Sequence, residues 1–121
     1  MINKVILVGN VGKVDVKNTP QGIKVAKLAI ATSKRYQDAN KEWKEQTTWH
    51  TVMVWRGLAE MVEKHIEVGQ QVYIEGELDN RSWDDEQGNK RYATEVVAQT
   101  LKMLGHKEKQ EPQTVTYSNF V

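Results

Sequence analysis

The stretch Thr47–Arg56 reads TTWHTVMVWR, and it predicts the strand around which the rest of the fold is arranged. Its β-branched and aromatic residues alternate, which puts Trp49 and Trp55 on one face and residues such as Val52 on the other. The two tryptophans lie about 20 Å apart along an extended strand. They belong either to the core or to a platform on which planar ligands stack, with Arg56 at its end to meet a negative charge. The strand alone leaves both interpretations open.

The composition fits one domain. The chain has 121 residues and no cysteine, which excludes disulfides, a thiol nucleophile and a cysteine-ligated metal. No segment approaches the roughly 20 apolar residues of a membrane span, and the apolar run near the N-terminus is too short for a signal sequence. A soluble cytoplasmic protein without a membrane partner is the expectation.

The formal net charge of +1 conceals an uneven distribution. Residues 1–35 carry seven basic residues against one acidic residue, whereas the remainder carries ten basic against fifteen acidic residues. A basic first third suits an anionic polymer as partner. An ordinary solvated strand face is the alternative interpretation.

Two strands are expected before the central one, at residues 3–17 and 23–32, joined by a turn at Thr19–Gly22. Gly9 and Gly12 predict a bulge or bend in the first strand, because glycine lacks the Cβ that blocks such a turn. Residues 33–46 are polar and lack a period, so we expect a long loop there, itself a flexible hairpin.

Apolar residues at helical spacing between Gly57 and Gly69 predict a short helix packed on the sheet, with Gly69 just past its end. Strands are then expected at 71–83, broken at Gly76, and at 90–99, joined by a turn at 84–89. Residues 100–105 are the last ordered piece of a domain spanning 1–105, and 106–121 form a short, largely disordered tail. This order predicts an all-β, five-stranded OB barrel with one short helix between strands 3 and 4, a fold whose exposed face binds oligonucleotides.

Four aromatic residues on separate strands and loops each have a lysine or arginine nearby: Tyr36, Trp49, Trp55 and Trp83. Aromatic rings that stack on bases, together with cations that meet phosphates, bind single strands with little sequence preference, at roughly 1–3 kcal/mol per stacked base. Duplex DNA hides its base faces, so stacking favours single strands. Trp43 either binds in the same way or clamps the base of its loop.

Five segments resemble, in order, the bacterial single-stranded-DNA-binding protein family. They are NKVILVGN (3–10), KEQTTWH (44–50), GLAE (57–60), GQQVYIEG (69–76) and RYATEVV (91–97). The resemblance covers residues 1–105. It implies a nucleoid-associated OB-fold homotetramer that wraps single-stranded DNA in replication, recombination and repair.

The resemblance and the local charge pattern together define the expected site. Base stacking is expected at Tyr36, Trp49, Trp55 and Trp83. Phosphate contacts are expected at Lys4, Lys34, Arg35, Lys44, Arg56 and Arg81, and subunit contacts at His50, Gln71 and Tyr73.

The sequence departs from the family pattern in three places. Asp79–Ser82 stands where the family usually has a basic cluster, and Arg56-Gly57 stands where it often has Gly-Lys. The chain ends in SNFV rather than in an acidic tip closing in Pro-Phe, so recruitment of replication or repair proteins through such a tip is not carried over. A phage, plasmid or otherwise specialised member of the family fits these departures.

Two other classes of function remain as alternatives. An RNA-binding or primosome-type OB interaction module could use the same aromatic residues, and the relative affinity for matched RNA and DNA oligomers separates it from a DNA binder. An enzyme is not expected, because no nucleophile lies beside a base, no phosphate loop is present and Asp84–Glu86 resembles a solvated hairpin tip. The histidines lack metal-ligand spacing, so neither a metal nor a cofactor is expected.

Overall fold

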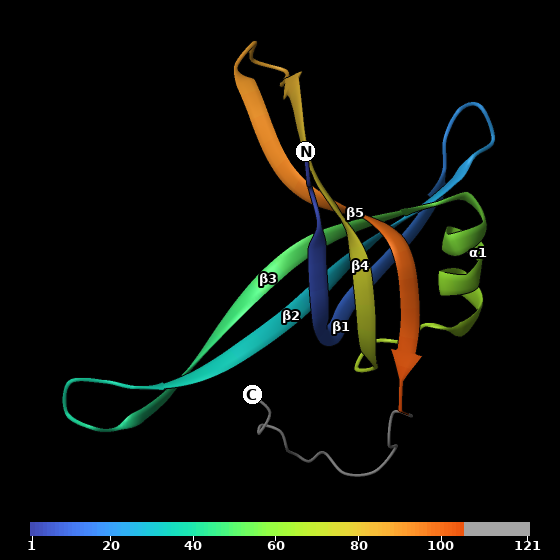
Figure 1. Ribbon diagram of the computed structural model, residues 1–121. Helices are drawn as coiled ribbons and strands as arrows, with labels where there is room; N and C mark the ends of the chain where they lie inside the picture. Colours follow the sequence, from blue (N-terminus) through green and yellow to red (C-terminus); the bar gives the residue numbers. More distant parts are fainter. Residues whose placement is uncertain (106–121) are drawn as a thin grey trace.

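The computed structural model describes residues 1–105, and the tail expected at 106–121 lies outside the described residues. Five strands and one helix follow one another along the chain (Figure 1). They are β1 (Val5–Asn18), β2 (Lys24–Gln37), β3 (Trp43–Trp55), α1 (Arg56–His65), β4 (Gln71–Asp84) and β5 (Lys90–Leu104).

The strands form a closed barrel in the order β1-β2-β3-β5-β4. All neighbouring strands are antiparallel except β3 and β5, whose short parallel contact pairs Val52 with Val96 and Met53 with Val97. This arrangement confirms the predicted five-stranded barrel with its helix between the third and fourth strands.

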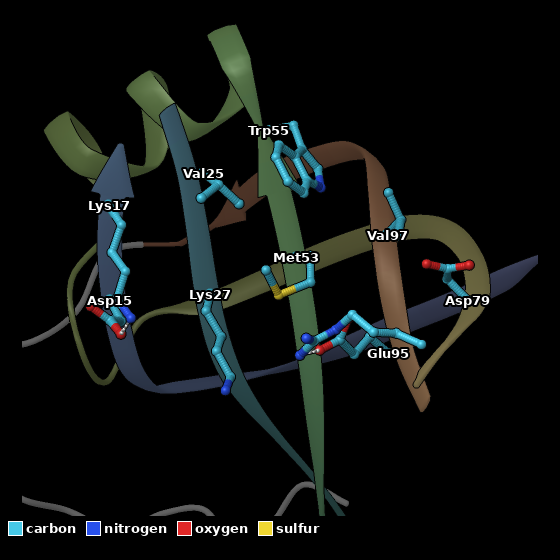
Figure 2. Close-up of a pocket in the computed structure, with 10 residues that line it drawn as sticks. Asp15, Lys17, Val25, Lys27, Met53, Trp55, Asp79, Glu95 and Val97 are labelled. Carbon is cyan, nitrogen blue, oxygen red and sulfur yellow. Dashed lines mark hydrogen bonds and ion pairs between the residues drawn. The ribbon is translucent and has the colours of Figure 1, made fainter. Parts of the chain in front are cut away.

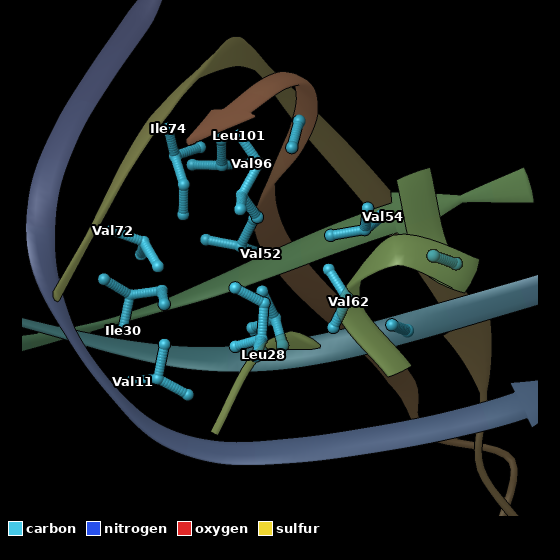
Figure 3. Close-up of a cluster of buried hydrophobic side chains, with 14 residues drawn as sticks. Val11, Leu28, Ile30, Val52, Val54, Val62, Val72, Ile74, Val96 and Leu101 are labelled. Carbon is cyan, nitrogen blue, oxygen red and sulfur yellow. The ribbon is translucent and has the colours of Figure 1, made fainter. Parts of the chain in front are cut away.

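Alternation along the strands builds the core. On β2, β3 and β4 every second residue points inward, and Leu28, Val52 and Ile74 are fully buried (Figure 3). Helix α1 adds Ala59 and Val62 at one end of the barrel. Complete burial of an aliphatic side chain of this size stabilises the fold by about 1.5–3 kcal/mol. Among residues 1–105 the buried cluster contains no aromatic side chain, so the barrel closes without its tryptophans.

Two glycines allow neighbouring strands of the barrel to approach each other closely. A Cβ on Gly9 would overlap the carbonyl oxygen of Ala31, and one on Gly76 would overlap that of Val97. The predicted bulge in β1 lies between residues 11 and 13. At Gly76, where a break was expected, β4 shows a register shift against β5, but the strand itself continues through this residue.

The hairpin expected at 33–46 is present, but it is built of two regular paired strands rather than a long loop. Strands β2 and β3 stay paired as far as Gln37 and Trp43, and only the residues between them turn. Figure 1 shows this twisted ribbon, which we call the arm (residues 33–47), projecting from the barrel. Both faces of the arm lack a core to cover, so its sequence shows none of the alternation that marks a half-buried strand.

The helix ends earlier than expected. Its last residue is His65, and Gly69 lies in the following turn with φ of +96°. The amide of Gly69 donates to the carbonyl of Val11 at 2.7 Å, and Val11 donates to the carbonyl of Gln70 at 2.9 Å. Gly69 therefore docks this turn onto β1 instead of ending the helix. No helix within residues 1–105 has the length and apolar character needed to cross a membrane.

Candidate nucleic-acid interface

The tryptophans of β3 lie on the outer face of the barrel. Trp49 is 60% exposed and Trp55 is 41% exposed, whereas Val52 and Val54 on the opposite face are fully buried. The cross-strand partner of Trp49 is the small residue Ala31. Between the two interpretations that the strand leaves open, the structure places both rings outside the core.

Trp49 rests on a glycine of the neighbouring strand. A Cβ added to Gly12 would overlap Cζ3 of the Trp49 ring and lie 2.6 Å from Cη2. Any larger residue at this position would push the ring away from β1. Gly12 therefore sets the position of this ring as well as the bulge of the strand.

A groove of about 330 Å³ runs over the same outer face (Figure 2). Trp55 and Met53 of β3 lie in its middle, with residues of β1 and β2 on one side and residues of β4 and β5 on the other. Its lining carries three cations and three carboxylates, so it has no net charge: Lys17, Lys27, Arg81, Asp15, Asp79 and Glu95.

An ion pair in the groove holds a third tryptophan. Nε and Nη2 of Arg81 donate to Oε1 and Oε2 of Glu95 at 3.2 and 2.9 Å, and Glu95 is only 4% exposed. The hydrogen bond and charge of Glu95 raise the pKa of Arg81 further above its usual value. The guanidinium carbon also lies 4.8 Å from the centre of the Trp83 ring, a cation–π contact. Glu95 thus positions Arg81, and Arg81 supports Trp83.

Trp83 lies just before the tip of the β4–β5 hairpin, and the carboxylate of Asp85 holds this tip together through hydrogen bonds. Oδ1 of Asp85 accepts hydrogen bonds from the amides of Gln87 and Asn89, and its Oδ2 accepts one from Nε of Arg91. The backbone hydrogen bond from Asn89 is the main reason that the pKa of Asp85 is lowered. Trp83 remains 42% exposed beside this tip.

Tyr36 lies apart from the tryptophans. Its cross-strand partner is Lys44, and directly opposed residues share one face of a ladder. Trp49 has the other parity on β3, so Tyr36 faces the reverse side of the arm. The structure therefore brings Trp55 and Arg81 to one groove, with Trp83 stacked on Arg81 beside it, and it places Trp49 on the same outer face, but it does not bring Tyr36 there.

The six expected phosphate contacts fall into two groups. Lys4 pairs with Glu75 at 2.5 Å, which raises the pKa of the lysine and lowers that of the glutamate, and Arg81 is paired as described. Lys44 has two carboxylates at 3.9 Å. Within residues 1–105 the other three cations have no carboxylate partner within 4 Å: Lys34, Arg35 and Arg56.

The expected subunit contacts lie away from the groove. His50 is half-buried, with Nε2 at 2.8 Å from Oγ1 of Thr32. The hydroxyl of Tyr73 donates to Oε1 of Glu75 at 3.4 Å. Gln71, two residues before Tyr73 on β4, is exposed. Tyr73 is opposite Val8 of β1, one of two exposed aliphatic residues on that strand; the other is Ile6.

Sequence reasoning missed Lys27 and Met53. They are direct cross-strand partners, and both line the groove beside Trp55. Alternation along the second strand could have identified Lys27. Once the register of the hairpin is known, every second residue of that strand lies on the same outward face as the tryptophans. No group of three or more histidine, aspartate and glutamate residues in the described part of the chain is placed to hold a metal ion.

The barrel order and the single helix define an OB-fold protein with an exposed aromatic groove on its outer face. The chain belongs to the single-strand binding protein family, whose model matches residues 2–104.

Two relatives and two solved structures show how far the similarity extends. A single-stranded DNA-binding protein of Rhizobium meliloti (strain 1021) is 48% identical over 110 residues, covering 85% of this chain and 63% of the relative. Single-stranded DNA-binding protein 1 of Chlorobaculum tepidum is 40% identical over 109 residues, covering 88% of this chain and 67% of the relative. The chain therefore spans about two thirds of the length of these relatives.

Among solved structures, a Plasmodium falciparum SSB in complex with ssDNA superposes with a TM-score of 0.78 at 30% identity, covering 87% of this chain and 97% of that one. A deletion mutant of the single-stranded DNA binding protein from Thermus aquaticus superposes with a TM-score of 0.75 at 28% identity. This match covers 86% of this chain and 51% of that one.

Proposed function

We propose that this chain binds and protects single-stranded DNA, with little sequence preference and without catalysis, in replication, recombination and repair. The observation that carries the proposal is that Trp49, Trp55 and Trp83 stay 41–60% exposed on a barrel whose described core contains no aromatic residue. Large apolar rings left in water by a complete core are typical of a surface that binds a partner.

Stacking on nucleobases explains why the partner is a single strand. Every base offers a π-face, so each ring binds any base at roughly 1–3 kcal/mol, and a duplex keeps those faces covered. The unpaired cations Lys34, Arg35 and Arg56 supply phosphate contacts, and Lys27 adds one inside the groove. The family and the ssDNA complex of the Plasmodium relative support the same choice of ligand.

The protein acts as a homo-oligomer, and the family resemblance makes this a tetramer. Each subunit contributes a DNA-binding domain at residues 1–105. Ile6 and Val8 expose apolar surface on β1, and Val8 is paired with Tyr73, so this side of the barrel suits contact with a second copy. A DNA-binding protein of this kind acts in the cytoplasm at the nucleoid. Light scattering on the free protein measures the oligomer, and a monomeric mass would contradict it.

Tryptophan fluorescence during titration with oligo-dT tests the function. We expect strong quenching by the single strand, little by a duplex of the same length, and reversal at high salt. Trp49→Ala, Trp55→Ala and Trp83→Ala should each weaken binding by roughly 5- to 150-fold, the loss of one stacked base, with the circular dichroism of the fold unchanged. If all three variants bind normally, these tryptophans do not stack on bases and this explanation of binding is wrong. Tighter binding to matched oligo-U would instead favour an RNA-binding module.

A further inference from the structure

Trp43 is the third tryptophan on the outer face of β3. The pairing of β2 with β3 runs without a register shift from Val25 and Trp55 to Gln37 and Trp43. The alternation of β3 is therefore uninterrupted, and Trp43 precedes Trp49 by the same six residues that separate Trp49 from Trp55. The three rings share one face of the β2–β3 ladder, each about 20 Å from the next along the strand.

One side of the Trp43 ring is supported and the ring remains accessible. The guanidinium carbon of Arg35 lies 5.0 Å from the ring centre, from the neighbouring strand on the same face of the arm. The residue is nevertheless 60% exposed, as much as Trp49. An indole with a cation on one face and water on the other is ready to accept a planar group on its open face.

Folding of the arm does not account for this ring. Backbone hydrogen bonds from Asp38 to Glu42 and from Lys41 to Asp38, each 2.9 Å, close the tip. The side chain of Asp38 accepts two more from the amides of Asn40 and Glu42. The side chain of Gln37, opposite Trp43, donates to the carbonyl of Lys41 at 2.9 Å. Backbone and polar side chains therefore hold the tip, and the indole is left free.

We propose that Trp43, backed by Arg35, stacks a nucleobase of the same single strand that occupies the groove, so that the binding track extends along β3 to the tip of the arm. The inference rests on the proposed function. It makes Trp43 the continuation of the track on its own face of the arm. The arm then lengthens the strand held by one protomer beyond what the barrel alone covers.

A length series of labelled oligo-dT, followed by fluorescence anisotropy, tests the proposal on the full chain. For the native protein we expect the affinity to rise at the length where the strand first reaches the third ring. Trp43→Ala should lack this rise, binding long oligomers roughly 5- to 150-fold more weakly and short ones normally. Trp43→Phe should restore part of the rise. Gln46→Ala, which truncates an exposed polar residue on the same strand of the arm, is the matched control and should behave like the native protein.

Each other outcome has a definite meaning. If the native protein binds no oligomer of any length, the proposed function itself is wrong. If the native protein binds and Trp43→Ala gives the same affinities at every length, only the inference about Trp43 is overturned. A fall in affinity for long and short oligomers alike, or a changed molecular mass for Trp43→Ala, would also overturn it, since the ring would then support the fold or a contact between copies.

Discussion

Glu95 brings a negative charge into the wall of the barrel, where it has almost no contact with water. A buried charge is tolerated only when it is paired and hydrogen-bonded. Arg81 supplies both bonds and, through its stacking on Trp83, links a buried carboxylate to an exposed ring. The residue expected to meet a phosphate is thus already bound within the protein, and its clearest role is to position Trp83.

Substitution of Arg81 tests how much the buried carboxylate of Glu95 depends on its partner. Arg81→Leu leaves the carboxylate buried and unpaired, so we expect it to destabilise the fold by about 2 kcal/mol, less than for a fully buried pair because Arg81 itself is half exposed. Urea denaturation measures the loss. Adding Glu95→Gln to Arg81→Leu should recover part of the lost stability, whereas strictly additive losses would mean that the pair contributes nothing.

Gly12 offers a second test at the scale of one residue. Gly12→Ala should displace the Trp49 ring, because the new Cβ overlaps it, while the exposed ring moves aside and the free energy of unfolding changes by less than about 1 kcal/mol. We expect weaker oligo-dT binding and a shifted tryptophan emission spectrum. In the Trp49→Ala background the same substitution should have no further effect on affinity; an undiminished effect there would show that Gly12 acts on something other than the ring.

At the scale of elements, the junction between β3 and α1 carries a backbone that does not suit its residues. Arg56 adopts φ of +60°, a left-handed conformation that costs a non-glycine residue roughly 1–2 kcal/mol. Gly57, which would tolerate it, instead occupies the first turn of α1 with an ordinary φ. The positive charge of Arg56, directly after β3, is therefore present at a position where its backbone conformation lowers the local stability.

Gly57→Ala should raise the free energy of unfolding by about 0.5–1 kcal/mol, because alanine favours the helix and the site has open space around it. Chemical denaturation measures the gain. Gly22→Ala is the matched control. Its site is equally open, but its φ of +84° should make the same substitution destabilising. If both variants shift stability in the same direction, backbone conformation is not what distinguishes these glycines.

At the scale of the whole molecule, the aromatic groove carries no net positive charge. The groove has equal numbers of cations and carboxylates, and two of the expected phosphate contacts, Lys4 and Arg81, form close ion pairs within the chain. The cations without carboxylate partners in the described residues include Lys34, Arg35 and Lys27. We therefore expect stacking to contribute most of the affinity in the groove and these cations to set its salt dependence.

The salt dependence of oligo-dT binding tests this division. A plot of log K against log salt concentration should fall by about 0.7 for each phosphate neutralised. Lys27→Ala should make the slope shallower by about that amount, because this cation is free to meet a phosphate. Lys4→Ala should change it little, because Glu75 already neutralises that lysine. A larger change for Lys4 than for Lys27 would reverse the assignment.

The sequence by itself determined the five strands, the helix, their order and the common face of Trp49 and Trp55. These features depend on alternation and helical spacing, which are local properties of the backbone and can be read from neighbouring residues. The family resemblance added the expected function and the candidate residues. The hairpin of the arm was expected, but its regular strands were missed, because a strand pair exposed on both faces has no alternation.

Only the tertiary structure decided how distant residues meet. The support of Trp49 by Gly12, the Arg81–Glu95 pair and the separation of Tyr36 from the tryptophans all depend on strand register and on barrel closure. A shift of one residue in register would move a side chain to the other face of the sheet, and no local pattern specifies such a register between strands far apart in the chain. The sequence therefore predicted which rings are available for binding, and the closed barrel determined which of them share one face.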